Sequence, residues 1–383
     1  MTIWQIFEGV LTSVLASAVI ALALWAKAQL KRRRKQRIPY HLEFRIGDWF
    51  PGVPFILADG VDLDKPQQLR AGNIRCEKAD SSSFKLPEEL APFRNDIVKA
   101  YNRGSFLELT DGTIARLESF AIARAGASEF PVWVLKFGPL SYFDFICTNL
   151  ALTPTFKPVV LPKEVLEALG RHRQIIDSLD LSFHEILRCQ RLGNGLTIHL
   201  NIIDTNGHLL VGRRPPHLSI YGGKLVTSVT GAVNWQKDQL GSAPDIFLAA
   251  IRETKEETGI RLNREDIVFY ALGMQADQRH PLLLGAAKIK GNLAEAMGLG
   301  QDAWENEIFY YLDLEDIKTA AAVLRYGDWI PASAVAVALS LLDVHGYEKL
   351  ARSLSKADKR SFRAWSQQTP WLSRQKQKFP LFA

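Results

Sequence analysis

Cysteine is scarce in this chain of 383 residues, and the three cysteines that it has stand far apart. They do not form the close pairs that zinc sites and redox motifs use, and their odd number does not indicate a disulfide framework. We therefore expect reduced thiols in or near the core of a protein that stays in a reducing compartment. The three residues are Cys76, Cys147 and Cys189.

The sequence also lacks internal repeats, which excludes a repeat array. With 47% hydrophobic residues, a chain of this length can hold two or more ordinary domains. We predict four parts: a membrane anchor with a basic segment (1–37), an accessory α+β domain of unknown role (38–185), a catalytic domain (186–355) and a basic aromatic tail (356–383). His172 and His184 have no partner at metal-ligand spacing, so we interpret them as core or surface residues.

Charge is absent from Gly9–Ala26, which is mostly Val, Leu, Ala and Ile, with Trp4 and Trp25 near its ends. Such a run is typical of a transmembrane helix, at the lower edge of the length that spans about 30 Å of hydrocarbon. A cleaved signal peptide is the alternative, because Ala26-Lys27-Ala28 offers a small residue on each side of a possible cleavage site.

The distribution of charge around this run favours the transmembrane helix. A signal peptide needs cations before the apolar run, whereas here Glu8 precedes it and residues 31–37 carry six positive charges after it. The positive-inside rule then predicts a single-pass protein with its N-terminus outside and the catalytic region in the cytoplasm.

Positive charge is concentrated at the two ends of the chain. The net charge is +6, but residues 31–37 and 356–383 each carry +6, so residues 38–355 carry −6. An acidic body predicts no nucleic-acid partner. The basic ends suit an anionic membrane surface, and the tail adds aromatic residues typical of a membrane interface, a disordered end or a nucleic-acid arm. These are Phe362, Trp365, Trp371, Phe379 and Phe382.

Local patterns predict a hairpin followed by a helix in the catalytic region. The Asn206-Gly207 pair separates two strand-like runs, Leu196–Asp204 and Leu209–Arg214. Further on, Gly241–Ile260 predicts a helix from about Ala243 to Thr258, with a capping start at Ser242 and Asp245 and a left-handed stop at Gly259.

Three glutamates share one face of this helix, because Glu253, Glu256 and Glu257 are three and four residues apart. Like charges at this spacing repel one another, so the face is either solvated or the site of a cation. From charge alone, the solvated face is the commoner case.

The order of these residues resembles the second half of the Nudix hydrolase box, over Arg252-Glu253-Thr254-Lys255-Glu256-Glu257-Thr258-Gly259-Ile260. Thr254 fills a slot that is apolar in the family. The resemblance implies that Glu253, Glu256 and Glu257 bind Mg²⁺ or Mn²⁺ and that Arg252 orients them. It also implies an α/β fold, a Nudix-like α/β/α sandwich with a mixed sheet, preceded here by the accessory α+β domain and one N-terminal transmembrane helix.

The first half of the box departs from the family pattern. The family has a glutamate where this chain has Pro244 and a glycine where it has Asp238, while Asp245 and Gly241 stand close by in a shifted register. We expect these two neighbours to substitute.

Other residues complete the list of candidates. Glu305 and Glu307 precede a predicted late strand, where related hydrolases often place a further ligand or the general base, and the alternative is a pair of solvated acids. Arg213 and Arg214 end the hairpin and either reach a phosphate or are surface charges.

The resemblance implies a membrane-anchored hydrolase that cleaves the pyrophosphate bond of a nucleoside diphosphate linked to another moiety, by metal-activated water. The predicted catalytic residues are Arg252, Glu253, Glu256, Glu257 and Glu305. A different class of function is an inactive, Nudix-shaped module that binds a nucleotide as a sensor or adaptor at the membrane. A third is a membrane scaffold with an incidental acidic helix.

Overall fold

The computed structural model describes residues 43–50, 52–80, 83–102, 109–123, 131–153, 161–179, 182–218, 220–298, 306 and 308–367. Contacts between backbone atoms group residues 42–383 into one compact unit. The predicted transmembrane helix Gly9–Ala26 and the basic residues 31–37 lie outside the described residues, as do residues 368–383 of the tail. Of the helices that are described, none is both long and apolar enough to cross a bilayer.

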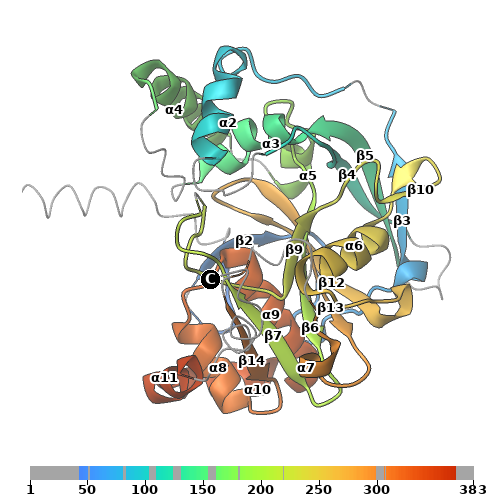
Figure 1. Cartoon of the computed structure of the whole chain (residues 1–383), viewed down its shortest axis with the longest axis vertical. Helices are drawn as coiled ribbons and strands as arrows, with labels where there is room; N and C mark the ends of the chain where they lie inside the picture. The colour runs from blue at the N-terminus through green and yellow to red at the C-terminus, as the bar shows by residue number, and fades with distance from the viewer. Residues whose placement is uncertain are drawn as a thin grey trace, which may run out of the picture. The chain divides into compact units, whose positions relative to one another are not determined.

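The described strands are spread along the chain and differ in length (Figure 1). They are β1 (Glu43–Phe44), β2 (Val53–Leu57), β3 (Ile74–Lys78), β4 (Thr113–Ala123), β5 (Val132–Ser141), β6 (Thr197–Ile203), β7 (His208–Arg213), β8 (Leu225–Val226), β9 (Val229–Ala232), β10 (Gln239–Leu240), β11 (Ala243–Pro244), β12 (Ile267–Gln275), β13 (His280–Lys288) and β14 (Ile308–Asp313).

Helices lie between these strands and follow the last of them. They are α2 (Arg94–Asn102), α3 (Tyr142–Thr148), α4 (Lys163–Ser178), α5 (Phe183–Arg188), α6 (Ile246–Thr258), α7 (Leu293–Ala296), α8 (Ile317–Tyr326), α9 (Pro331–His345), α10 (Tyr347–Ser355) and α11 (Lys359–Ser366). Short 3-10 turns are η2 (Ala71–Asn73), η3 (Ala91–Phe93), η4 (Leu150–Leu152) and η5 (Arg264–Asp266).

A nine-stranded sheet is the centre of the described structure. Its order is β1-β2-β12-β13-β6-β7-β14, with β8 beside β7 and β9 beside β6. β13 and β6 are parallel, whereas their other neighbours pair antiparallel, so the sheet is mixed. β6 pairs with β9 at its start, over Thr197–Leu200, and with β7 only at Ile203, so the sheet divides on that side of β6.

The alternation of residues along β6 explains how both faces of this sheet are covered. Ile198, Leu200 and Ile202 belong to the apolar cluster that contains the buried face of α6. The intervening side chains point the other way, because His199 bonds Ser333 and Asn201 bonds the Ala336 carbonyl, both on α9. The result is an α/β/α sandwich around a mixed sheet, as predicted, with α6 and α9 on opposite faces (Figure 1).

The predicted hairpin is confirmed as the pair β6–β7. Gly207 has a φ of +79°, the left-handed conformation that glycine adopts at little energetic cost. Asp204 Oδ1 accepts hydrogen bonds from the Asn206 and His208 amides at 2.8 and 2.9 Å, which closes the turn.

Helix α6 ends where the sequence predicts but begins later. Gly259 has a φ of +73° and its amide donates to the Lys255 carbonyl, as expected of a left-handed cap. The N-cap is Asp245, which accepts from the Phe247 and Leu248 amides at 2.9 and 3.1 Å. Ala243 and Pro244 instead form β11, so the predicted start at about Ala243 is wrong by three residues.

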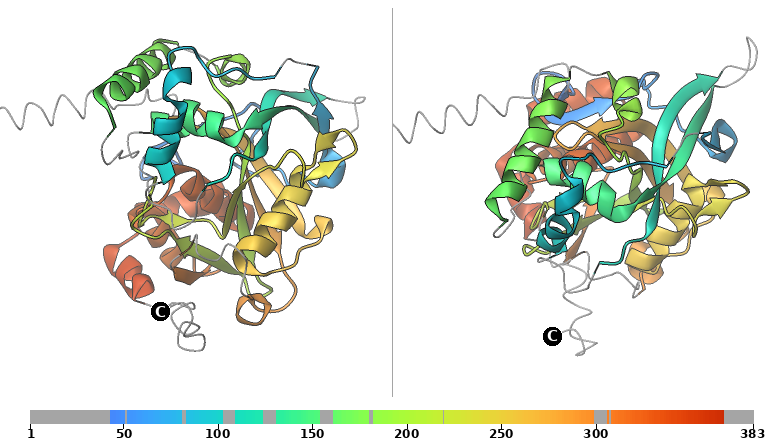
Figure 2. Two further views of the ribbon diagram at one scale, coloured as in Figure 1. Left: turned by 45° about the horizontal axis from the view of Figure 1, so that its top comes forward. Right: turned by 90° about the horizontal axis from the view of Figure 1, so that it is seen from above.

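The segment predicted as an accessory domain shares its structure with the rest of the unit. β2 pairs antiparallel with β12 from Phe55 to Leu57 and so belongs to the nine-stranded sheet. β3, β5 and β4 form a separate three-stranded sheet, in which β4 and β5 make a long ribbon (Figure 2). The Ala115 amide of this ribbon donates to the Val233 carbonyl at 2.8 Å, so the described residues of 43–179 contact those of 186–355 directly.

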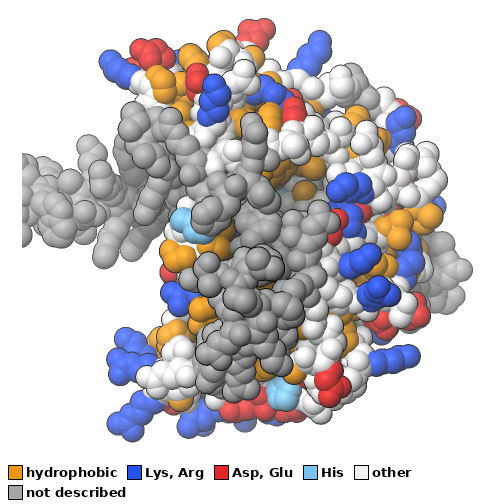
Figure 3. Space-filling model, viewed as in Figure 1, with side chains coloured by type: hydrophobic (Ala, Val, Ile, Leu, Met, Phe, Trp, Pro, Cys, Tyr) orange, Lys and Arg blue, Asp and Glu red, His pale blue; other side chains and the backbone are white. Residues whose placement is uncertain are grey.

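The described surface mixes charges of both signs. On the face drawn in Figure 3, Lys and Arg side chains alternate with Asp and Glu around the rim, without one dominant sign among the atoms described there. The three cysteines are free thiols, and burial raises the pKa values of Cys76 and Cys147 to about 12.

Two buried histidines lie side by side on the α9 face of the sheet. His199 Nδ1 is 3.1 Å from Ser333 Oγ, and His280 Nε2 is 3.1 Å from Thr197 Oγ1. Burial lowers the pKa of each to about 3, with help from Arg214 at His199 and from His199 at His280. Both imidazoles are therefore neutral in the folded protein at ordinary pH.

We predict that these histidines make the protein sensitive to mild acid. The unfolded chain takes up protons below pH 6.5 and the folded chain does not until about pH 3, so stability falls as pH drops through that window. One such histidine lowers the free energy of unfolding by about 2 kcal/mol at pH 5. Urea unfolding at pH 7 and pH 5 should show a smaller loss for His199→Asn than for the native chain. An equal loss in both, or an equal benefit from changing the exposed His217, would contradict the assignment.

Candidate functional site

Helix α6 presents the residues of the box from one side of the sheet. Ile246, Phe247 and Ala250 pack into the core, which turns Arg252, Glu253 and Glu256 toward β9 and the loop before the helix. Thr254, in the slot that is apolar in the family, is fully buried. Its hydroxyl donates to the Ala250 carbonyl at 2.6 Å, so the polar atom is satisfied inside the helix and the departure is harmless.

Arg252 binds every group around it through its guanidinium. Nη1 donates to Glu253 Oε1 and to Glu256 Oε2, each at 2.8 Å. Nη2 donates to the Ala232 carbonyl of β9 at 3.1 Å and to Asp238 Oδ2 at 2.8 Å, and Nε donates to Asp238 Oδ1 at 2.7 Å. All five N–H donors of the arginine therefore have an acceptor. The role of Arg252 in orienting metal ligands stays a prediction.

The neighbouring carboxylates keep the half-buried guanidinium of Arg252 ionised. Burial alone would lower the pKa of the guanidinium, but the hydrogen bonds to Asp238 and the charge of Glu253 outweigh it and raise that pKa above its ordinary value. A charged arginine is what two glutamates at this spacing need, since they would otherwise repel one another.

Asp238 is a partner of Arg252 that the sequence did not predict. It stands where the family has glycine, it is fully buried, and it binds the guanidinium with both carboxylate oxygens. Its Oδ2 also accepts from the Asn234 amide at 2.7 Å, which fixes the loop. The sequence offered one hint of this role, because Asp238 is a carboxylate in the loop before the helix with no other function assigned to it.

Asp245 and Gly241, which we expected to substitute in the first half of the box, make local contacts in the loop and at the helix start. Asp245 caps α6 and its Oδ2 accepts from Arg264 at 2.9 Å, so it supports the helix start rather than Arg252. Gly241 has a φ of +71° in the turn between β10 and β11. Asp245 is thus bound to Arg264 and to its own helix, and the substitution by these two residues stays a prediction.

Glu253 lies directly over the backbone of β9. A methyl group added at Gly231 would come within 2.0 Å of Glu253 Cδ and 2.3 Å of its Oε1. Glycine at this strand position is therefore what lets the carboxylate approach the sheet so closely.

Glu257 is the most buried of the three glutamates, with 2% of its surface exposed. Its Oε1 accepts from the Thr230 amide of β9 at 3.0 Å, and its Oε2 accepts from Asn306 Nδ2 at 3.3 Å. The first contact comes from the strand beside β6 and the second from the residue two before β14. Glu257 thus sits where the sheet divides.

The three glutamates of this helix face are held by different partners. Among the described residues, no group of three or more His, Cys, Asp or Glu side chains is arranged to hold a metal ion. The physical reason is that Arg252 holds Glu253 and Glu256, while Glu257 turns to Thr230 and Asn306.

Two observations nevertheless show that the residues suit a divalent cation. Carboxylate oxygens are the hard donors that Mg²⁺ prefers. Asn306, 4% exposed, places beside Glu257 an amide oxygen, Oδ1, that is buried and has no partner among the described atoms.

Solved structures similar to this chain include MutT and Nudix proteins. A MutT protein from Methanosarcina mazei Go1 is 18% identical, covers 41% of this chain and 93% of its own, and has a TM-score of 0.27. A MutT/nudix family protein from Enterococcus faecalis is 17% identical, covers 50% and 83%, and has a TM-score of 0.29. An Ap4A hydrolase from C. elegans is 18% identical, covers 38% and 95%, and has a TM-score of 0.24. No family profile and no curated protein matches the chain.

The remaining candidate residues from the sequence are two glutamates and two arginines. Glu305 and Glu307 lie outside the described residues, so their role stays a prediction. Arg213 is exposed and its Nε donates to the Gly223 carbonyl at 3.2 Å. Arg214 is half-buried, and its Nε has no hydrogen-bond partner in the described structure.

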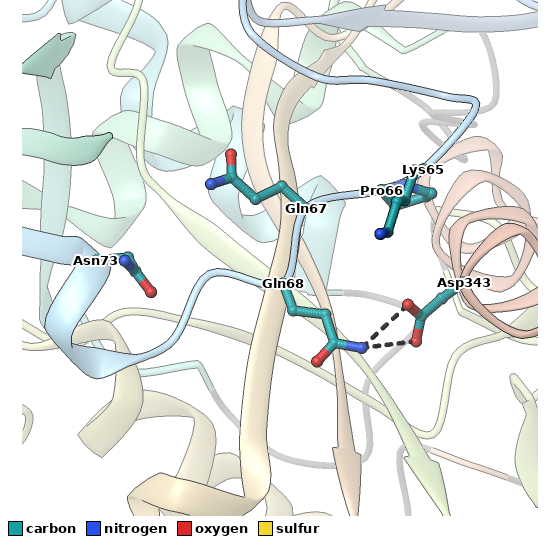
Figure 4. A pocket seen from close by; sticks show the side chains of 6 residues that line it. All are labelled: Lys65, Pro66, Gln67, Gln68, Asn73 and Asp343. Carbon is teal, nitrogen blue, oxygen red and sulfur yellow. Dashed lines mark hydrogen bonds between the residues drawn. The ribbon is translucent and has the colours of Figure 1, made fainter. Parts of the chain in front are cut away.

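A cavity of about 470 Å³ opens elsewhere on the unit, beside α9 (Figure 4). Gln68 Nε2 reaches across it to both carboxylate oxygens of Asp343, at 3.0 Å each. None of its lining residues is a predicted site residue, so it is separate from the box. They are Lys65, Pro66, Gln67, Gln68, Asn73 and Asp343.

We predict that Asp238, and not Asp245, supports the arginine. Asp238→Asn leaves the buried side of Arg252 without its charged partner and should lower the free energy of unfolding by about 3 kcal/mol. Asp245→Asn is the matched control, because asparagine also caps helices and the ion pair to Arg264 is partly exposed, so it should cost under about 1 kcal/mol. Urea unfolding of the two variants in one buffer checks this, and similar losses in both would contradict it.

Proposed function

We propose that this chain is a metal-dependent pyrophosphohydrolase of the Nudix type. The proposal rests on one observation above all: Arg252 binds Asp238, Glu253 and Glu256 together, and Glu257 follows one turn after Glu253. Three carboxylates bound to one guanidinium, with Glu257 on the same helix held by Thr230 and Asn306, leave a concentration of negative charge at the divided side of the sheet. Such a place suits a divalent cation and disfavours a bare anionic ligand.

The residues would divide the work as follows. Glu253, Glu256 and Glu257 would hold Mg²⁺ or Mn²⁺, and Arg252 would orient the first two of them. When bound, such a cation neutralises the charge of a diphosphate and makes a water molecule easier to deprotonate. In the absence of the cation Arg252 holds Glu253 and Glu256, and the Thr230 amide of β9 holds Glu257, so a cation would have to draw the three carboxylates together.

The substrate class in this proposal is a nucleoside diphosphate linked to a second moiety. Oxygen from water bonds to one phosphorus while the bridging oxygen leaves with the other phosphate, so that two phosphorylated products form. A base must remove the proton of the water, and Glu305 remains the residue proposed for that step.

The test measures metal-dependent stability and hydrolysis on the same protein. If the glutamates bind a cation, Mg²⁺ or Mn²⁺ at one hundred times Kd should stabilise the native chain by about 2.7 kcal/mol, seen as a rise in Tm. Glu256→Gln keeps an acceptor for Arg252 but lacks the charge, so it should lose most of this gain and the hydrolysis of diphosphate compounds. Glu265→Gln, an exposed acid outside α6, is the matched control and should retain both.

The outcomes separate the possible functions. A Tm that does not change up to millimolar metal would rule out a metal site of either kind. A metal-dependent rise without hydrolysis of any diphosphate in a broad panel would instead select a nucleotide-binding sensor.

We also propose that the chain is anchored in the membrane by Gly9–Ala26, with the box on the cytoplasmic side. The support is in the sequence: the run is uncharged and six cations follow it in residues 31–37. The expected outcome is that protease added to intact cells leaves the region around Arg252 uncut and that cleavage needs a permeabilised membrane. Cleavage there in intact cells, or recovery of the chain without membranes after mild lysis, would overturn the anchor.

A further inference from the structure

Asn306 is a buried amide held between the sheet and helix α6. Its side chain is 4% exposed, and its Nδ2 donates to Glu257 Oε2 at 3.3 Å. The other end of the amide, Oδ1, is buried and has no hydrogen-bond partner among the described residues. A buried acceptor left without a donor destabilises the folded protein unless another group fills it.

The orientation of the amide is set by its contact with Glu257. A carboxylate oxygen accepts hydrogen bonds, and Nδ2 is the edge of Asn306 that meets it. Oδ1 is thereby fixed on the other edge of the same planar group and cannot exchange places with Nδ2 without losing the contact. Oδ1 of Asn306 is therefore left without a donor because Nδ2 of the same amide binds Glu257.

The sheet makes room for this amide. A methyl group added at Gly212 of β7 would lie 2.4 Å from Asn306 Oδ1 and 2.9 Å from Val226 Cγ1. Glycine at this position is extended rather than left-handed, so its role is the space that it leaves. Gly212 of β7 therefore lies beside Oδ1, which still has no donor among the described residues.

An unfilled acceptor alone does not mark a site, as Asn201 shows. Asn201 is fully buried, donates to the Ala336 carbonyl and to Ser340, and also has an Oδ1 without a partner in the described structure. It lies between β6 and α9, where its partners are uncharged. Asn306 differs because its own partner is a buried carboxylate of the box.

We propose that Asn306 positions Glu257 and that its Oδ1 supplies a further oxygen toward the divalent cation, either to the ion or to a water in its shell. This inference rests on the function proposed above and deepens it. The chemistry is consistent, since an amide oxygen is a hard, neutral donor that adds to the site without adding negative charge. Partners of this kind orient a ligating carboxylate, and their loss typically weakens metal binding 10- to 100-fold.

The decisive comparison uses two substitutions at one position in the full-length chain. Asn306→Leu has a similar volume but neither donates nor accepts, so it should weaken Mn²⁺ affinity at least tenfold and reduce the metal-dependent rise in Tm. Asn306→Asp places a second carboxylate against Glu257. It should lower the Tm without metal through repulsion and enlarge the rise that Mn²⁺ produces. Bound Mn²⁺ is counted directly by electron paramagnetic resonance, so the readout does not depend on turnover.

A structural role for Asn306 gives a different pattern. If the amide only joined the residues before β14 to the helix, both substitutions would lower the metal-free Tm and leave the Mn²⁺ affinity unchanged. Asn201→Leu is the matched control, because it removes a buried amide with the same unfilled oxygen on the opposite face of the sheet. It should lower stability without altering Mn²⁺ binding.

The result also separates this inference from the proposed function. Equal Mn²⁺ affinity in the native chain and in Asn306→Leu would overturn the role of Asn306 and leave the metal site of the glutamates standing. Absence of Mn²⁺ binding in the native chain would overturn both.

Discussion

The guanidinium of Arg252 joins three parts of the chain in the candidate site. It binds a carboxylate from the loop before the helix, a carbonyl of β9 and two glutamates of its own helix. Each of these groups is buried or partly buried, so each needs the charge or the donors that the arginine supplies. Lysine could not replace it, because a single ammonium has three donors and no planar fork with which to bind Asp238 at two points.

This dependence explains how an altered box still forms an ordered site. Pro244 cannot provide a carboxylate, and as part of β11 it belongs to a strand rather than to the helix. Asp238 provides the carboxylate from a different point in the loop, where its backbone carbonyl also accepts from the Asp245 amide at 2.7 Å. Asp238 thus binds Asn234 on one side of the loop and Asp245 on the other. These contacts hold its carboxylate against Arg252 without the glutamate that the family has in place of Pro244.

Features set by neighbouring residues were predictable from the sequence. The Asn206-Gly207 turn and the Gly259 stop depend on backbone conformations that few other residues adopt, and both are as predicted. The shared face of the glutamates follows from helical spacing alone. Contacts between distant segments were not predictable in this way. Asp238 meets Arg252 and Asn306 meets Glu257 only because loops and strands bring them together, and no local pattern marks either pair.

The pairing of β2 with β12 has a consequence for any shortened form of this protein. Gly273, Met274 and Gln275 bond to β2, which comes from the beginning of the described chain. A protein beginning at residue 186 would leave that edge of β12 open, with a row of unpaired backbone groups along an apolar strand. Open edges of this kind recruit strands from other molecules. The N-terminal strands therefore act as a cover against self-association, and their presence guards solubility as much as it completes the sheet.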